Sequence, residues 1–213
     1  MAPKFLQAVA LALYASIVLA APIFSRTAVS GVQITYNGTL ATEFCCYNNG
    51  MSGAQWSAAT VCKTFNASET AFIPLPTTFK GMCQAGKGIG ATMAEFQLKA
   101  ADGLAWGDIS LQQGCDRAAT IQTMDGTNNV AGFTKNVLED APTAAFYTTG
   151  AVSRVALATT MGSWISPANP AAIDYLNEAV GQYNAYITGG SGTKVVMDKT
   201  NRLAITFGPG ASG

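Results

Sequence analysis

Short segments in which apolar and polar residues alternate make up most of this chain. In the clearest one, residues 31–37, Val32, Ile34 and Tyr36 share one face before a turn at Asn37. The other strand-like segments are 93–99, 104–111, 119–124, 144–149, 152–159, 194–198 and 202–207. Short strands at this spacing predict a mainly β fold, an antiparallel β-sandwich, with a barrel as the alternative.

Two pairs of these segments are predicted to form hairpins. Residues 93–99 and 104–111 flank a turn at 101–103, and residues 194–198 and 202–207 flank a turn at 199–201.

One amphipathic helix is predicted near the C-terminus, over about 170–187. Asn169 followed by Pro170 is a typical helix start. The apolar stripe has helical spacing and consists of Ile173, Leu176, Val180 and Tyr183. A second, weaker helical pattern covers 52–63. We expect the C-terminal helix to pack on the sheets.

Residues 1–20 have the pattern of a secretory signal peptide. A short positive segment ending at Lys4 precedes an apolar run, and Val18-Leu19-Ala20 supplies small residues at the usual cleavage spacing. The run is shorter than the roughly 20 residues that span a bilayer, although an uncleaved anchor is the alternative. We therefore expect residues 21–213 to be secreted as a single β-rich domain, with no membrane association after cleavage.

Two sequons fit a secretory route. They are Asn37-Gly38-Thr39 and Asn66-Ala67-Ser68, and we expect Asn37 or Asn66 to carry an N-linked glycan.

Five cysteines are candidates for disulfide formation in an oxidising compartment: Cys45, Cys46, Cys62, Cys83 and Cys115. Adjacent residues of a strand point to opposite faces, so Cys45 and Cys46 are expected to bond to different partners. Two bridges leave one cysteine over, and 15 arrangements are possible because 5 × 3 = 15. The odd cysteine is expected to be buried or to form an intermolecular bridge.

Composition excludes several kinds of chemistry. Charged residues make up 11% of the chain, and the formal net charge is zero, so no basic surface for nucleic acid is expected. The chain has no histidine, which excludes Ser-His-Asp and Cys-His catalysis and histidine-ligated metals. No metal constellation and no nucleotide fingerprint is visible, so we predict no metal site and no cofactor.

Carboxylates are therefore the candidate catalytic groups. Folding the chain about residues 101–103 brings Glu95 close to Asp108. Glycoside hydrolysis uses two such carboxyl groups, although an exposed pair on a solvated sheet face is the simpler interpretation. Trp106 follows the turn and precedes Asp108, which makes it the best of three tryptophans for stacking on a sugar ring.

Residues 91–116 resemble the central part of thaumatin-like proteins. The matching motifs are Ala94-Glu95-Phe96 and Asp108-Ile109-Ser110-Leu111, with the two acids thirteen positions apart. The resemblance implies a β-sandwich with an acidic cleft that binds, and in some members slowly hydrolyses, β-1,3-glucan. The family's further Asp, five positions after the second acid, is Gln113 here, so Asp116 is its possible substitute as a ligand-binding residue. The family is also richer in disulfides.

These observations support two hypotheses about function. The first is a secreted cell-wall or extracellular protein that binds β-glucan through an acidic cleft. If it is an enzyme, it is a weak endo-β-1,3-glucanase that uses Glu95 and Asp108. The second is a non-enzymatic interaction protein, such as an effector, an allergen-like protein or a wall component. The signal-like segment, the sequons and the composition rich in Ala, Thr and Gly resemble those of small secreted fungal proteins. The expected partner is a wall polysaccharide or an extracellular protein, and the sequence indicates no oligomeric state.

Overall fold

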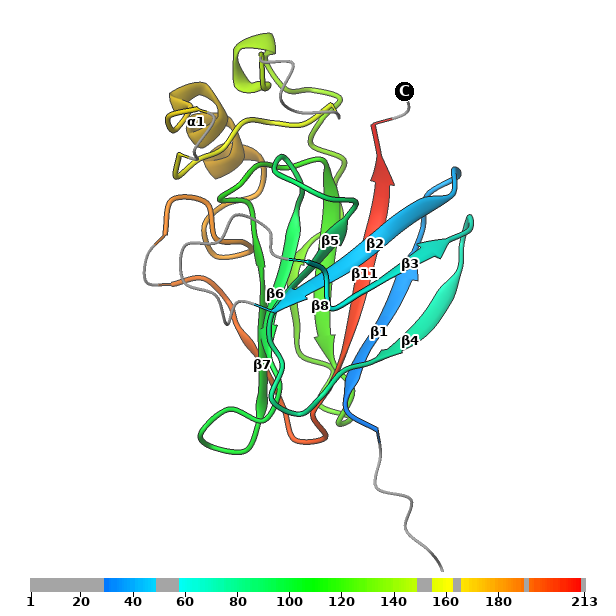
Figure 1. Cartoon of the computed structure of the whole chain (residues 1–213). Coiled ribbons are helices and arrows are strands. Elements are labelled where there is room, and N and C mark those ends of the chain that lie inside the picture. The colour runs from blue at the N-terminus through cyan, green and yellow to red at the C-terminus, as the bar shows by residue number, and fades with distance from the viewer. Residues whose placement is uncertain (1–28, 49–57, 149–154, 163–165, 190–191, 212–213) are drawn as a thin grey trace, which may run out of the picture.

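Two β-sheets pack face to face in the computed structural model (Figure 1), which describes residues 29–48, 58–148, 155–162, 166–189 and 192–211. The five-stranded sheet has the order β4-β1-β11-β8-β9, and the six-stranded sheet has the order β10-β7-β6-β5-β2-β3. The strands are β1 (Gly31–Tyr36), β2 (Thr42–Asn48), β3 (Val61–Phe65), β4 (Thr70–Pro74), β5 (Lys80–Ala85), β6 (Met93–Gln97), β7 (Ala105–Ser110), β8 (Arg117–Thr123), β9 (Val130–Phe133), β10 (Val196–Asp198) and β11 (Arg202–Gly210). The predicted mainly β sandwich is confirmed.

Most neighbouring strands run antiparallel, as predicted. One pair differs, because β1 and β11 are parallel and in register from Gly31 opposite Arg202 to Tyr36 opposite Phe207. The two strands come from opposite ends of the described chain, so no hairpin constrains their direction.

Aromatic rings join the two sheets in the core. Phe44 of β2 stacks on Phe207 of β11 with ring centroids 4.7 Å apart, and it meets Phe65 edge-on at 5.4 Å. All three side chains are buried. Because β2 and β11 belong to different sheets, this contact fixes the packing of the sandwich.

The predicted helix is present but shorter than expected. Helix α1 (Pro170–Ala179) begins at Asn169, whose side chain accepts a hydrogen bond from the Ala172 amide. The prediction of a helix to about 187 is wrong, because the Val180 and Gly181 amides both bond to the Leu176 carbonyl and Gly181 has φ +80°. A glycine in this left-handed conformation ends a helix.

The predicted hairpin of 194–198 and 202–207 is also wrong. Strand β10 pairs with β7 in one sheet, whereas β11 lies between β1 and β8 in the other. Asp198 explains the separation, because its buried carboxylate accepts hydrogen bonds from the Thr200 and Met124 amides. These bonds hold the 199–201 turn between the sheets.

Residues 144–149 and 152–159 do not form the predicted strands where the structure describes them. A short 3-10 helix, η1 (Thr143–Ala145), comes first, and Leu157 then makes isolated bridges to Cys115 and Phe146. Residues 149–154 lie outside the described ranges. Of the weaker helical pattern at 52–63, residues 52–57 also lie outside them, and 61–63 belong to β3.

The predicted signal peptide, residues 1–20, lies outside the described residues. Within the part of the chain that the structure does describe, no helix has the length and apolar character needed to cross a membrane.

Candidate functional site

Glu95 and Asp108 lie directly opposite each other on neighbouring strands. The predicted hairpin places Glu95 near residues 107–109, and the β6–β7 register pairs it with Asp108. Both point away from the sandwich interior, because their chain neighbours face it: Ala94 and Phe96 lie in the core, and a Cβ atom at Gly107 would clash with Ile121 of the other sheet. Directly opposed residues have Cβ atoms about 4.5–5.5 Å apart, so the two acids form a close carboxyl pair.

Burial raises the pKa of both members of the carboxyl pair. Desolvation raises the pKa of Glu95, and a hydrogen bond with Ser110 lowers it by a smaller amount. Desolvation, followed by repulsion from Glu95, raises the pKa of Asp108 to about 8. Asp108 Oδ1 is buried without a hydrogen-bond partner, and no ion pair found among the described residues involves either acid.

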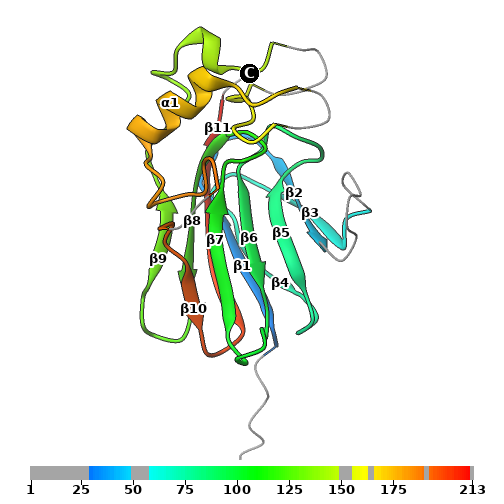
Figure 2. The ribbon, with the colours of Figure 1, turned by 90° about the vertical axis from the view of Figure 1, so that its left-hand side faces the viewer.

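The outer face of the six-stranded sheet is turned toward the viewer in Figure 2. On this face a surface hollow surrounds the carboxyl pair. We call it the acidic groove. It consists of two adjoining hollows of about 330 and 530 Å³. Its lining includes Lys80, Glu95, Gln97, Trp106, Asp108 and Tyr186.

Trp106 lies in the wall of this groove, two residues before Asp108. Its indole Nε1 donates a 2.9 Å hydrogen bond to Asp102 Oδ2, which fixes the ring's orientation. Across the sheet, Trp106 is paired with Gln97 of β6 on one side and with Met197 of β10 on the other. The ring is half-buried, so one part remains accessible to a ligand.

Tyr186 closes the groove along the edge of β7. Its carbonyl accepts a hydrogen bond from the Leu111 amide, and its own amide donates to the Ile109 carbonyl. These bonds make Tyr186 a one-residue extension of the sheet beside Ser110. No local pattern near Tyr186 indicates this role, because the contact depends on the tertiary fold.

An apolar cluster lies beside the carboxyl pair on the same outer face. It contains Cys45, Tyr47, Met82 and Met93, all buried. Met82 is directly opposite Glu95 in the β5–β6 register. This cluster excludes water from one side of Glu95, which accounts for the desolvation of the pair.

Asp116 lies elsewhere. It is 2% exposed, and its carboxylate binds the Arg117 guanidinium at 3.2 Å and the Thr92 amide at 2.9 Å. It does not line the acidic groove, so the structure does not bring it together with Glu95 and Asp108. Its observed contacts are those of a structural ion pair.

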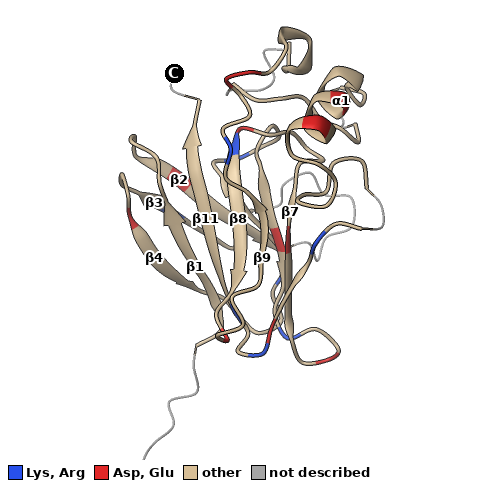
Figure 3. Ribbon diagram, turned by 180° about the vertical axis from the view of Figure 1, so that it is seen from behind, with Lys and Arg blue, Asp and Glu red and all other residues tan. Residues whose placement is uncertain are grey.

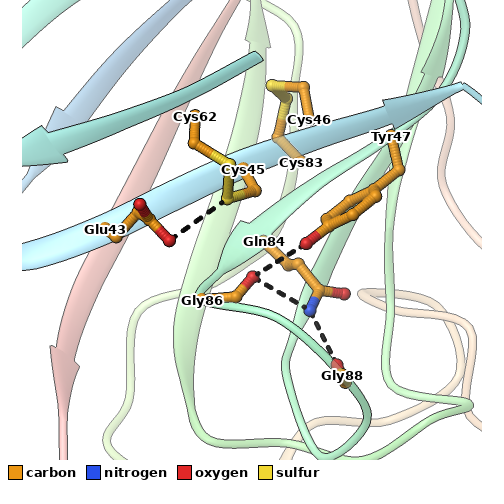
Figure 4. The surroundings of a disulfide bond; sticks show 9 residues. All are labelled: Glu43, Cys45, Cys46, Tyr47, Cys62, Cys83, Gln84, Gly86 and Gly88. Atoms are coloured by element: carbon orange, nitrogen blue, oxygen red, sulfur yellow. Dashed lines mark hydrogen bonds between the residues drawn. A yellow bond between two sulfur atoms is a disulfide. The ribbon is translucent and has the colours of Figure 1, made fainter. Parts of the chain in front are cut away.

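Two disulfides join β2 to its two neighbouring strands. Cys45 bonds to Cys62 of β3, and Cys46 bonds to Cys83 of β5 (Figure 4). The prediction that adjacent cysteines bond to different partners is confirmed. Cys115 is the odd cysteine and is buried, and burial raises its thiol pKa to about 12. An intermolecular bridge through Cys115 is therefore not supported.

One group of potential metal ligands lies close to these disulfides. It comprises Glu43, Cys45 and Cys62. Because both sulfurs belong to a disulfide, the group offers one carboxylate and no thiolate, which is a poor set for a metal ion.

Both sequon asparagines are exposed. Asn37 follows β1, and Asn66 lies in the turn between β3 and β4, where its side chain donates to Glu69. Glycosylation of Asn37 or Asn66 stays a prediction.

A separate cleft, of about 600 Å³, lies at one end of the sandwich. Its walls include Tyr36, Leu40, Arg117 and Leu138. Its buried cation, Arg117, is already neutralised by Asp116, and the described lining of the cleft includes a single carboxyl residue, Glu139. Charged residues elsewhere are scattered along the ribbon (Figure 3).

Fold and groove together define a disulfide-bonded β-sandwich protein with a carboxyl pair in a surface groove. No family model and no curated protein matches the chain, so no comparison supports the thaumatin-like resemblance of residues 91–116. Among solved structures, the chain is similar to the protein elicitor MoHrip2 from Magnaporthe oryzae. The TM-score is 0.41 and the identity 8%, over 84% of this chain and 98% of that chain. Nothing about function follows from a likeness at this level.

Proposed function

We propose that this chain is a secreted interaction protein that binds its partner through the acidic groove without hydrolysing it. The observation that carries the proposal is the state of the carboxyl pair. A retaining glycosidase needs one ionised carboxylate as nucleophile beside one protonated acid, about 5–5.5 Å apart. Here the two opposed acids are desolvated and neither has a cation partner among the described residues, so a proton that the pair retains is shared between the two carboxyl groups and neither is a free nucleophile. The groove is therefore better suited to hydrogen bonding than to nucleophilic attack.

An extracellular location is supported by the disulfides. Two bridges among five cysteines are typical of a chain that folds in an oxidising compartment. The signal-like residues 1–20 agree with that location.

A neutral wall polysaccharide such as β-1,3-glucan is the ligand class that the groove fits best. Sugar rings stack on aromatic side chains, and Trp106 offers a ring held in place by Asp102. Glu95, Asp108 and Gln97 surround that ring with hydrogen-bonding groups for hydroxyls.

A protein partner is the second candidate. Met197 is 45% exposed and lies next to Trp106 of the acidic groove. Exposed large apolar side chains beside a groove are common at protein interfaces.

The test is a single incubation of the secreted, oxidised protein with insoluble β-1,3-glucan, chitin and cellulose. Pelleted protein reports binding, and released reducing ends report hydrolysis. We expect retention on β-1,3-glucan, no sugar release, and loss of retention in folded Trp106→Ala. Glu43→Gln, on the exposed part of β2, is the matched control and should bind normally. Sugar release that disappears in Glu95→Gln would refute the non-enzymatic assignment. Absence of retention on all three polymers would favour the protein partner.

A further inference from the structure

We infer that Glu95 and Asp108 hold one proton between them and that this proton makes the acidic groove selective for uncharged, hydroxyl-rich polysaccharide over acidic polysaccharide. The inference rests on the proposed function and specifies how its site recognises the ligand.

The strand register and the burial of the pair favour a shared proton. Two carboxylates opposed across neighbouring strands repel each other, and the buried Met82 beside Glu95 limits the water that could screen them. No described ion pair compensates either charge. Retaining one proton removes the repulsion and converts the pair into one donor and one acceptor.

The surroundings indicate which residue carries the proton. The Ser110 hydroxyl forms a hydrogen bond with Glu95 that favours the ionised form of that carboxyl. No hydrogen bond of this kind lowers the pKa of Asp108, and its Oδ1 is buried without a hydrogen-bond partner. Asp108 is therefore the acid and Glu95 the acceptor.

Few other ionisable groups face the pair. Lys80 projects from β5 and is exposed, Tyr186 lies along the edge of β7, and Asp102 is bound to the Trp106 indole at the β6–β7 turn. On β10 the outward residue next to Trp106 is the uncharged Met197, while Asp198 points to the opposite face and is buried. None of these groups is paired with Glu95 or Asp108 in the described structure.

This arrangement determines which polymer can bind. A sugar hydroxyl both donates and accepts, so it can bridge the Asp108 donor and the Glu95 acceptor. The carboxylate of a polyuronate accepts only, and it would bring a third negative charge to a desolvated pair. Loss of the shared proton at high pH would leave two acceptors and no donor, so binding of a neutral polymer should weaken.

The experiment measures binding of soluble β-1,3-glucan and of polygalacturonate to the oxidised, full-length secreted protein at pH 5, 7 and 9. We expect glucan affinity to fall about tenfold between pH 5 and 9, the usual effect of losing one hydrogen bond to a buried group. Polygalacturonate should not bind measurably at any of these pH values. Asp108→Asn supplies a permanent donor, so this variant should keep its pH 5 affinity at pH 9. Glu43→Gln, the same kind of change at an exposed position, should keep the wild-type profile.

A carboxyl-carbon NMR titration separates the two proposals. Asp108 should retain its proton well above the usual range for aspartate, and Glu95→Gln should return its titration towards that range. Titration of wild-type Asp108 near 4 would overturn the inference, as would an unchanged pH profile in Asp108→Asn. If Asp108 keeps its proton but no polysaccharide binds, the shared proton stands, whereas the polysaccharide ligand and the selectivity inferred here are refuted.

Discussion

Cys45 and Cys46 are adjacent in the chain, yet they form disulfides on opposite faces of β2. Cys46 and Cys83 belong to the main core between the sheets, whereas Cys45 lies in the apolar cluster on the outer face. The same dipeptide therefore ties β2 to both of its neighbours and links the core to the apolar cluster beside the carboxyl pair.

The two disulfides should contribute unequally to stability. They close chain separations of 17 and 37 residues, for which loop entropy gives about 3 and about 4 kcal/mol. Replacing Cys46 and Cys83 by Ala also removes buried sulfur from the main core. We therefore expect Cys46→Ala/Cys83→Ala to lower the free energy of unfolding more than Cys45→Ala/Cys62→Ala does. Urea denaturation of both double variants measures this difference, and equal costs would contradict it.

Stability should fall as the pH rises from about 4 to 8. An unfolded aspartate has a pKa of about 3.9, whereas desolvation and Glu95 raise that of folded Asp108 to about 8. In this window the folded state keeps a proton that the unfolded state has lost. The contribution is therefore fully present below about pH 4 and is lost as the pH rises through 8. Asp108→Asn should flatten the dependence.

Urea midpoints at pH 5 and pH 8 measure this effect. The wild-type midpoint should be lower at pH 8, and the difference should shrink in Asp108→Asn but persist in Glu43→Gln. The same loss of stability in wild type and Asp108→Asn would show that other groups cause it.

The hairpin that carries the site is the part of the fold that the sequence predicts best. Residues 93–99 and 104–111 alternate clearly and surround a Gly-containing turn, so the hairpin, and the position of Glu95 near residues 107–109, follow from local pattern. The structure fixes the exact register, in which Glu95 is opposite Asp108. Strand β5 lacks this signal, because Met82 is buried outside the sandwich and Cys83 is buried inside it. Burial on both faces removes the alternation on which strand prediction depends.

The remaining residues of the groove could not be predicted for a different reason. Lys80 and Tyr186 come to line the groove through strand order and an isolated bridge, and neither position leaves a local sequence pattern. Strand β10 is three residues long, and its pairing with β7 depends on the hydrogen bonds that Asp198 makes. Such contacts are decided by tertiary packing.

Asp116 should be important for folding and not for binding. Asp116→Ala would leave the buried Arg117 guanidinium without its carboxylate partner, which typically costs about 3–5 kcal/mol. Asp116→Ala/Arg117→Met removes both charges and should recover much of that loss. The free energy of unfolding of both variants checks this expectation, and the folded double variant should bind β-1,3-glucan like the wild type. A selective loss of glucan binding would instead place Asp116 in the binding site.

Asn169 should stabilise the helical end of the sandwich in two separable ways. Its Oδ1 accepts from the Ala172 amide at the start of α1, and its Nδ2 donates to the Ala144 carbonyl of η1. Loss of a helix cap costs about 1 kcal/mol, and loss of a hydrogen bond costs about as much again. Asn169→Ala should therefore cost about 2 kcal/mol in the free energy of unfolding. Asn169→Asp keeps the capping oxygen but cannot donate to Ala144, so it should cost about half as much. Equal costs for the two variants would show that the bond to η1, and not the cap, holds α1 in place.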